Sequence, residues 1–92
     1  MKRPDKEKMQ QLREELFLGI DEGEFTLGEA TRRMRKTLGM SRQEYAKQIL
    51  KINHDTLRDI ETEKGNPTLK TLQIIGKPFG LKVGFMRKKP PE

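Results

Sequence analysis

The sequence has no cysteine and no tryptophan, and one histidine among its 92 residues. Without cysteine the chain forms neither a disulfide nor a thiolate metal site. One histidine, with no acidic cluster at ligand spacing, also argues against a bound metal ion, so we expect no cofactor. A chain this short buries a modest core, and a second copy of the chain is therefore the expected source of further stability.

Long apolar runs are absent as well. No stretch approaches the roughly 18 consecutive apolar residues that a membrane span requires. No apolar stretch follows the basic residues near the start, so no secretory signal is predicted. These absences predict a soluble, cytoplasmic protein that has no membrane partner.

Residues for catalysis are also scarce. The single histidine, His54, lies in the helix predicted below to contact DNA, and the chain has no cysteine to serve as a nucleophile. Gly76, Gly80 and Gly84 are too widely spaced to form a loop that cradles a phosphate. The sequence therefore predicts a binding protein rather than an enzyme.

Positive charge is abundant and unevenly distributed. The net charge is +6; residues 1–25 carry 5 basic and 7 acidic side chains, whereas residues 26–92 carry 15 basic and 7 acidic ones. A basic domain attracts polyanions, but ribosomal and membrane-surface proteins share this property. Charge alone therefore does not single out DNA.

The first 25 residues predict a helix over 5–20 and a linker over 21–25. Apolar residues form a stripe at helical spacing: Met9, Leu12, Leu16, Phe17 and Ile20. This stripe can pack on the rest of the fold, extend a dimer interface or bind another protein.

Two capping boxes predict the next helix starts. Thr26 precedes Glu29 by three residues, the spacing at which each side chain caps the backbone amide of the other, and Ser41 precedes Glu44 in the same way. The first of these helices should run to about Leu38, before a glycine suited to a left-handed cap. The second begins after Ser41, and its expected inner face comprises Tyr45, Ala46, Ile49 and Leu50.

Two further helices are predicted from their N-caps. Asn53 caps a helix from His54 to about Lys64. Thr68 caps a last helix, whose end is bracketed by a proline and a glycine. Leu57 and Ile60 point inward on the first of these helices, and the last helix carries Leu69, Leu72 and Ile75.

The helices over 42–50 and 54–64 are joined by a very short turn. Each is marginal alone, so both must pack on their neighbours, and the second keeps a free polar side. An α-helix fits the major groove of B-DNA. In a helix-turn-helix, the second helix enters that groove with its N-terminal residues at the base edges, and we call it the reading helix. The pattern therefore predicts DNA binding.

Three stretches carry a resemblance to a known family: Leu38–Lys47, Thr56–Glu61 and Gly65–Leu72. Their order and spacing resemble those of the Cro/repressor-type helix-turn-helix proteins, also called the XRE family, over roughly residues 27–80. The resemblance implies an all-α fold, a lambda-repressor-like five-helix bundle, here with an extra N-terminal helix and a short C-terminal β-strand. It also implies binding to double-stranded DNA as a homodimer.

One departure from the family pattern concerns the turn. Between Ala46 and Ile60 the chain has one residue more than the usual spacing, and Leu50-Lys51-Ile52 stands where a glycine is common. The end of the first motif helix or the turn has to absorb the extra residue. The departure bears on the tilt of the reading helix.

The resemblance implies DNA contacts in three segments. Ser41 and Arg42 match the start of the first motif helix, where a phosphate is contacted, and Gln43 can contact the same strand or a base edge. Lys64 and Asn66 follow the reading helix and match positions that touch the second phosphate strand. The start of the reading helix supplies Asn53, His54, Asp55, Thr56, Arg58 and Asp59.

Chemistry distinguishes the residues of the reading helix. Arg58 can pair with guanine through both arms of its guanidinium. Asp55 and Asp59 can accept a hydrogen bond from cytosine, but acids repel phosphate, and Asp55 also favours a helix N-terminus by its charge alone. Asp55 and Asp59 therefore either read a base or have no role in DNA binding, and the sequence does not decide between these two interpretations. In the family, positions matching Arg35 and Glu61 form a structural ion pair that braces the bundle against the reading helix.

The end of the chain alternates apolar and polar residues. Leu81, Val83 and Phe85 would share one face of a strand, and this ending resembles that of HipB-like antitoxin regulators, in which a short strand pairs with its twin across a dimer. A strand folded back on its own bundle is the alternative. Residues 88–92 are expected to be disordered. The predicted organisation is an N-terminal helix and linker over 1–25, the helix-turn-helix domain over 26–80, and a dimerisation strand with a basic tail over 81–92.

Three functions compete on the sequence alone. The first is a transcriptional regulator, a dimeric repressor that reads an inverted repeat. The second is an antitoxin that represses its own operon and binds a toxin protein. The third is a non-specific nucleic-acid or ribosome-associated protein, which would bind random and operator DNA alike.

Overall fold

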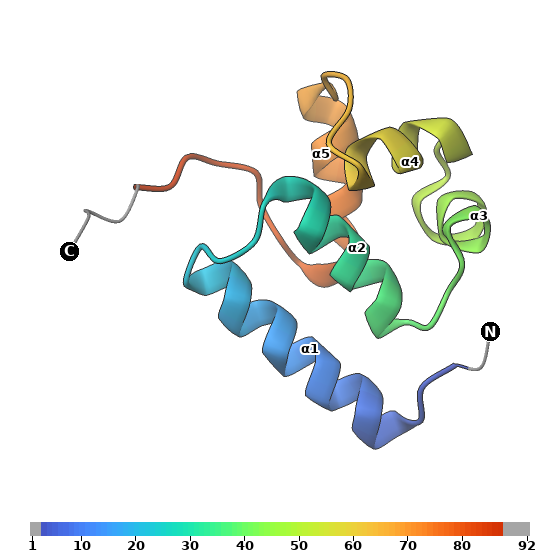
Figure 1. The fold of residues 1–92 in the computed structure, drawn as a ribbon, viewed down its shortest axis with the longest axis vertical. Helices are drawn as coiled ribbons and strands as arrows, with labels where there is room; N and C mark the ends of the chain where they lie inside the picture. Colours follow the sequence, from blue (N-terminus) through green and yellow to red (C-terminus); the bar gives the residue numbers. More distant parts are fainter. Residues whose placement is uncertain (1–2, 88–92) are drawn as a thin grey trace.

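The computed structural model describes residues 3–87, and these residues form helices and no β-strand (Figure 1). The expectation of an all-α fold is confirmed. Seven elements follow in order: α1 (Lys6–Asp21), α2 (Leu27–Thr37), α3 (Arg42–Glu44), the π-helical η1 (Tyr45–Leu50), α4 (His54–Glu61), α5 (Leu69–Gly76) and the 3-10 turn η2 (Lys77–Phe79).

The implied five-helix bundle is not complete in the described residues. From residue 26 onward the chain forms α2, α3 with η1, α4 and α5, and then the short turn η2 instead of a fifth helix. Pro78 lies in η2 and Gly80 ends it with φ +67°, so the helix stops there. α1 is the additional N-terminal helix.

The helix α1 packs on the bundle, which is one of the three uses left open by its apolar stripe. Leu16 is buried in the core, and Phe17 and Ile20 pack against it. Figure 1 shows α1 running beside α2. An edge-to-face contact between Phe17 and Phe79, with ring centroids 6.5 Å apart, joins α1 to η2 as well.

Local capping fixes the start of α2, and both bonds of the predicted box are present. The Thr26 hydroxyl accepts from the amide of Glu29 at 3.2 Å, and the Glu29 carboxylate accepts from the amide of Thr26 at 3.4 Å. Gly28, in the first turn, lies so close to α4 that a Cβ there would be 2.7 Å from the carbonyl oxygen of Ile60. The absence of a side chain therefore lets α2 brace the end of α4.

The core lies between these helices. Its members come from every element except α3, and from the loop before it: Leu16, Met34, Met40, Tyr45, Ala46, Leu50, Leu57, Ile60, Ile75 and Phe79. Leu57 and Ile60 on α4 point inward as predicted. The opposite side of α4 is thereby fixed toward solvent.

The extra residue of the motif is taken up in η1. A π-helical hydrogen bond closes on the fifth residue back and an α-helical bond on the fourth, so the segment holds one residue more per turn. Ala46 and Leu50 stay buried, but Ile49 is 38% exposed, so the prediction that Ile49 faces the core is wrong. The wider turn rotates it outward. Lys51 then takes a left-handed conformation, φ 55°, in the turn where glycine is common in the family.

The helix α4 ends at Glu61, three residues before the predicted end at Lys64. The Lys64 amide donates to the Asp59 carbonyl at 2.7 Å, and the Glu63 amide donates to the Ile60 carbonyl at 3.1 Å. This pair of bonds is a Schellman C-cap, with Glu63 at φ 60° in the position that glycine usually occupies.

The tail, residues 81–87, is not a strand in the single chain. A strand exists only with a hydrogen-bonded neighbour, and among the described residues the tail backbone has one such bond, from the Leu81 amide to the Gly76 carbonyl at 3.0 Å. Leu81 packs against the core, whereas Val83 and Phe85 are exposed. Residues 88–92, expected to be disordered, lie outside the described residues.

Candidate nucleic-acid interface

The exposed side of α4 carries most of the residues expected to read bases. His54, Asp55 and Arg58 are exposed, and Thr56 and Asp59 are half-buried. Asn53 precedes the helix and is exposed, but its side chain is engaged: Oδ1 accepts from the Asp55 amide at 2.7 Å. The helix N-terminus is thus capped from within, as predicted.

Arg58 is paired with two acids of its own helix. Its Nη1 donates to Asp55 Oδ1 at 3.1 Å, and its Nη2 donates to Asp59 Oδ1 at 3.4 Å. The ring nitrogen Nδ1 of His54 lies 3.5 Å from the same Asp55 oxygen. These contacts hold the guanidinium on the outer side of α4. A base that binds Arg58 must compete with the two carboxylates.

The start of α3 forms the second predicted capping box. The Ser41 hydroxyl accepts from the Glu44 amide at 3.2 Å, and the Glu44 carboxylate accepts from the Ser41 amide at 3.1 Å. The hydrogen bond from the Ser41 amide to the Glu44 carboxylate is the main cause that lowers the pKa of Glu44, and a hydrogen bond from the Ser41 side chain lowers it further. Gln43 is exposed beside the box.

Glu61, the last residue of α4, is shared by two arginines. Arg35 of α2 donates through Nε and Nη2 to the two carboxylate oxygens, both at 2.9 Å. Arg42 of α3 donates through Nη2 to Oε1 at 3.4 Å. One carboxylate therefore connects α2, α3 and α4. The structure brings Arg35 and Glu61 together, and it adds Arg42, which the sequence did not suggest.

The Glu61 cluster carries excess positive charge. Two guanidiniums face one carboxylate, and the side chains of Arg35, Arg42 and Glu61 are 9%, 30% and 1% exposed. The remaining amino group of Arg35, Nη1, donates a hydrogen bond to the Met40 carbonyl at 3.0 Å. Within the described chain the Nε of Arg42 is buried and has no hydrogen-bond partner.

Tyr45 lies close enough to Glu61 and Arg35 for their charges to act on its hydroxyl. It is fully buried, and its hydroxyl has no hydrogen-bond partner within residues 3–87. Burial, reinforced by the nearby Glu61 charge, raises the pKa of Tyr45 to about 12. The phenol is therefore neutral at physiological pH.

The remaining expected contact residues lie after α4. Lys64 and Asn66 are exposed in the loop that follows the Schellman cap. The expected dimerisation residues behave differently from one another. Leu81 and Val83 line an apolar groove between α2 and α5, and Phe85 does not.

The contact between Arg42 and Glu61 could not be predicted from the spacing of residues in the sequence. The link between Arg42 and Glu61 joins residues 19 positions apart and depends on how the helices pack. The pairing of Arg58 with Asp55 has a signal, because residues three apart on a helix are neighbours. That spacing could have identified the pair from the sequence.

Comparison with known proteins identifies the family. A helix-turn-helix family model of the XRE type matches residues 32–85, more than half of the 92 residues. The chain belongs to this helix-turn-helix family, whose members are DNA-binding transcription regulators. No curated protein and no solved structure matches the chain. Among residues 3–87, no helix is long and apolar enough to cross a membrane.

Proposed function

We propose that the protein is a dimeric, sequence-specific repressor that places α4 in the major groove of an inverted-repeat operator. The observation that carries this proposal is the arrangement of α4. Leu57 and Ile60 hold its inner side in the core, and its N-terminal half presents His54 and Arg58 to solvent. A family of DNA-binding regulators matches this part of the chain.

Phosphate contact is assigned to the start of α3, through Ser41, Arg42 and Gln43. Arg42 supports it best, because the excess positive charge of the Glu61 cluster favours a bound anion. Glu61 holds the Arg42 guanidinium and leaves it partly exposed. Lys64 and Asn66 are exposed and supply a contact to the second strand.

Base reading is assigned to Asn53, His54, Asp55, Thr56, Arg58 and Asp59. Arg58 can bind guanine O6 and N7 through two parallel hydrogen bonds. In the free protein Asp55 and Asp59 occupy the same donors. Asp55 and Asp59 also repel phosphates, so the two acids weaken non-specific contacts of Arg58 and favour a base that can replace both carboxylates.

Dimerisation is assigned to the tail through Leu81, Val83 and Phe85. Two tails that pair antiparallel across a two-fold axis would form the strand that the single chain lacks. Two copies of α4 would then read half-sites about one helical turn, or roughly 10 bp, apart.

The antitoxin alternative has less support. The apolar stripe of α1, one surface that a toxin could use, packs on the bundle through Leu16 and Ile20. The same DNA-binding surface would serve for autorepression, so the repressor proposal holds in either case. Co-purification of a toxin with the protein would favour the alternative.

The experiment compares sites selected from random DNA by wild-type protein and two variants. Arg58→Ala should change the preferred bases at one position of each half-site, and Arg42→Ala should weaken all sites alike. Lys6→Ala, an exposed cation on α1, serves as the matched control and should change neither. Identical site preferences for Arg58→Ala and wild type would refute the base-reading role.

A further inference from the structure

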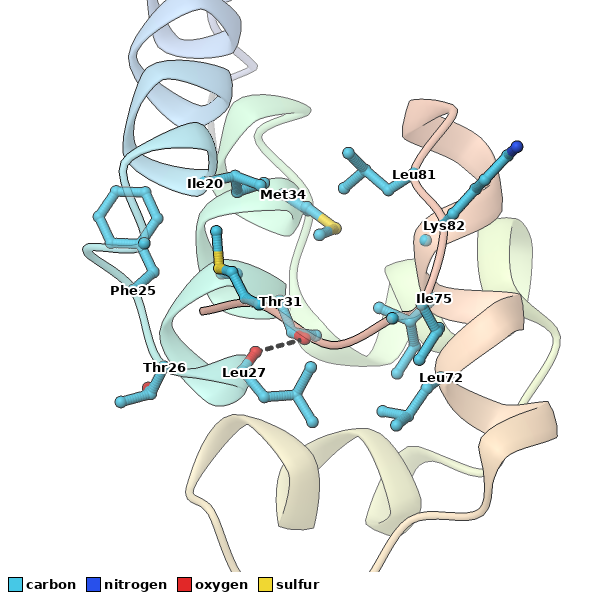
Figure 2. A pocket seen from close by; sticks show the side chains of 16 residues that line it. Ile20, Phe25, Thr26, Leu27, Thr31, Met34, Leu72, Ile75, Leu81 and Lys82 are labelled. Atoms are coloured by element: carbon cyan, nitrogen blue, oxygen red, sulfur yellow. Dashed lines mark hydrogen bonds between the residues drawn. The ribbon is translucent and has the colours of Figure 1, made fainter. Parts of the chain in front are cut away.

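An apolar groove runs between α2, α5, the end of α1 and the tail (Figure 2). Its volume is about 360 Å³. Apolar walls come from Ile20, Phe25, Leu27, Met34, Leu72 and Ile75. The residues that line it include none from α3, η1 or α4, so a group that fills the groove leaves the reading helix free.

The groove is suited to an apolar occupant. Two threonines line it, and the hydroxyls of both bond to residues of α2. Thr31 donates to the Leu27 carbonyl at 2.8 Å (Figure 2), and Thr26 serves the capping box. Both hydroxyl protons are therefore engaged, so neither threonine has a proton left to donate to a ligand.

The tail crosses the groove but does not fill it. Leu81, Val83 and Met86 line the groove, whereas Phe85 is fully exposed. Beyond Leu81, the tail backbone makes no backbone hydrogen bond to another described residue. An exposed aromatic side chain on an unpaired extended segment marks a surface that binds another chain.

We infer that the groove of each protomer receives Phe85 from a second copy of this chain. The inference rests on the proposed dimer and specifies its contact. Each copy of the chain carries both the groove and an exposed Phe85. In a dimer with a two-fold axis, each copy can therefore place its Phe85 in the groove of the other. Figure 1 shows the tail leaving the bundle on the side of α2 opposite α3, which keeps the contact away from the start of α3.

Reach and area are consistent with this exchange. Phe85 lies four residues beyond Leu81, which allows an extended reach of roughly 13 Å from the last residue packed on the core. A buried aromatic side chain contributes about 150–250 Å², and a stable interface needs roughly 800 Å² per partner. The exchanged ring therefore supplies part of the area on each partner, and the paired tails have to supply the rest.

The test measures dimer dissociation by analytical ultracentrifugation of the full chain without DNA. Phe85→Ala should raise the dissociation constant at least about tenfold, as expected for an aromatic anchor. Leu27→Glu, at a half-exposed wall of the groove, should do the same. Leu18→Ala removes an exposed apolar side chain that does not line the groove, and should leave the constant unchanged.

Mixing the two variants distinguishes exchange from a tail that fills its own groove. The heterodimer keeps one intact contact, because Phe85 of the Leu27→Glu copy enters the unaltered groove of the Phe85→Ala copy. The mixture should therefore dimerise at concentrations at which neither variant does alone. No recovery on mixing, or a Phe85→Ala dimer as tight as wild type, would overturn the inference.

Parallel DNA titrations separate this inference from the proposed function. A wild-type protein that binds its operator specifically as a monomer overturns the exchange and leaves base reading by α4 in place. Tails that exchange as expected, in a protein without sequence preference, overturn the proposed function and leave the exchange in place.

Discussion

Replacing Glu61 by alanine removes the carboxylate that Arg35 and Arg42 share. Both guanidiniums then keep their charge where the Arg35 side chain is 9% exposed. A buried charge without its counter-ion is strongly destabilising. DNA affinity should fall as well, because Arg42 loses the group that orients it toward a phosphate.

The structure sets the size of the effect. Removing one partner of a buried ion pair costs roughly 3–5 kcal/mol. Most of this cost comes from Arg35, which gives Glu61 two hydrogen bonds of 2.9 Å, and less comes from Arg42 at 3.4 Å. In a domain of this size, about 1 kcal/mol lowers Tm by roughly 4–8 °C, so we expect a fall on the order of 20 °C.

Thermal melts monitored by circular dichroism test the predicted fall in Tm. DNA titrations at a temperature where the variant is folded test the predicted fall in affinity. Glu14→Ala, an exposed glutamate of α1, is the control and should melt close to wild type. Replacing Arg35 and Glu61 together by methionine should recover part of the loss, because fewer buried charges are left unpaired. A Glu61→Ala variant that melts with wild type would refute the reasoning.

Three further changes test the backbone and the buried phenol. Lys51→Gly and Glu63→Gly should each raise the free energy of unfolding in urea by about 1 kcal/mol, because both residues have positive φ; Lys47→Gly should lower it, and losses in the first two would be contrary evidence. Deleting Gln48 should convert η1 to an α-turn and keep the helical signal and a cooperative melt; an unfolded product would disprove this role of η1. Wild type should lose stability between pH 10 and about 12, because the unfolded chain ionises its tyrosine first, and Tyr45→Phe should abolish that loss; equal pH profiles would contradict it.

Helix starts were predictable because their causes are local. A capping box needs a hydroxyl and a carboxylate three residues apart, and the boxes of Thr26 and Ser41 both form. Asn53 and Thr68 also cap their helices, each by accepting one backbone amide without the reciprocal bond of a box. The inward residues of α4 followed from the helical period, since Leu57 and Ile60 are buried.

Features that depend on packing or on unusual backbone were missed. The sequence places the end of α4 too late, because glycine is the usual signal for a C-cap and here Glu63 adopts the left-handed conformation instead. An α-helical period places Ile49 inward, but η1 is π-helical and Ile49 is exposed. The alternation of the tail predicted a strand, but a strand needs a partner that one chain does not supply. A pattern of residue types carries no information on these long-range conditions.

Selection of bound sites from random DNA by the full chain tests the central claim most directly. The proposal predicts an enriched inverted repeat with half-sites about 10 bp apart, bound at least about a thousandfold more tightly than random DNA at the same salt concentration. No enriched sequence, with equal affinity for all DNA and a steep loss of binding as salt rises, would contradict it.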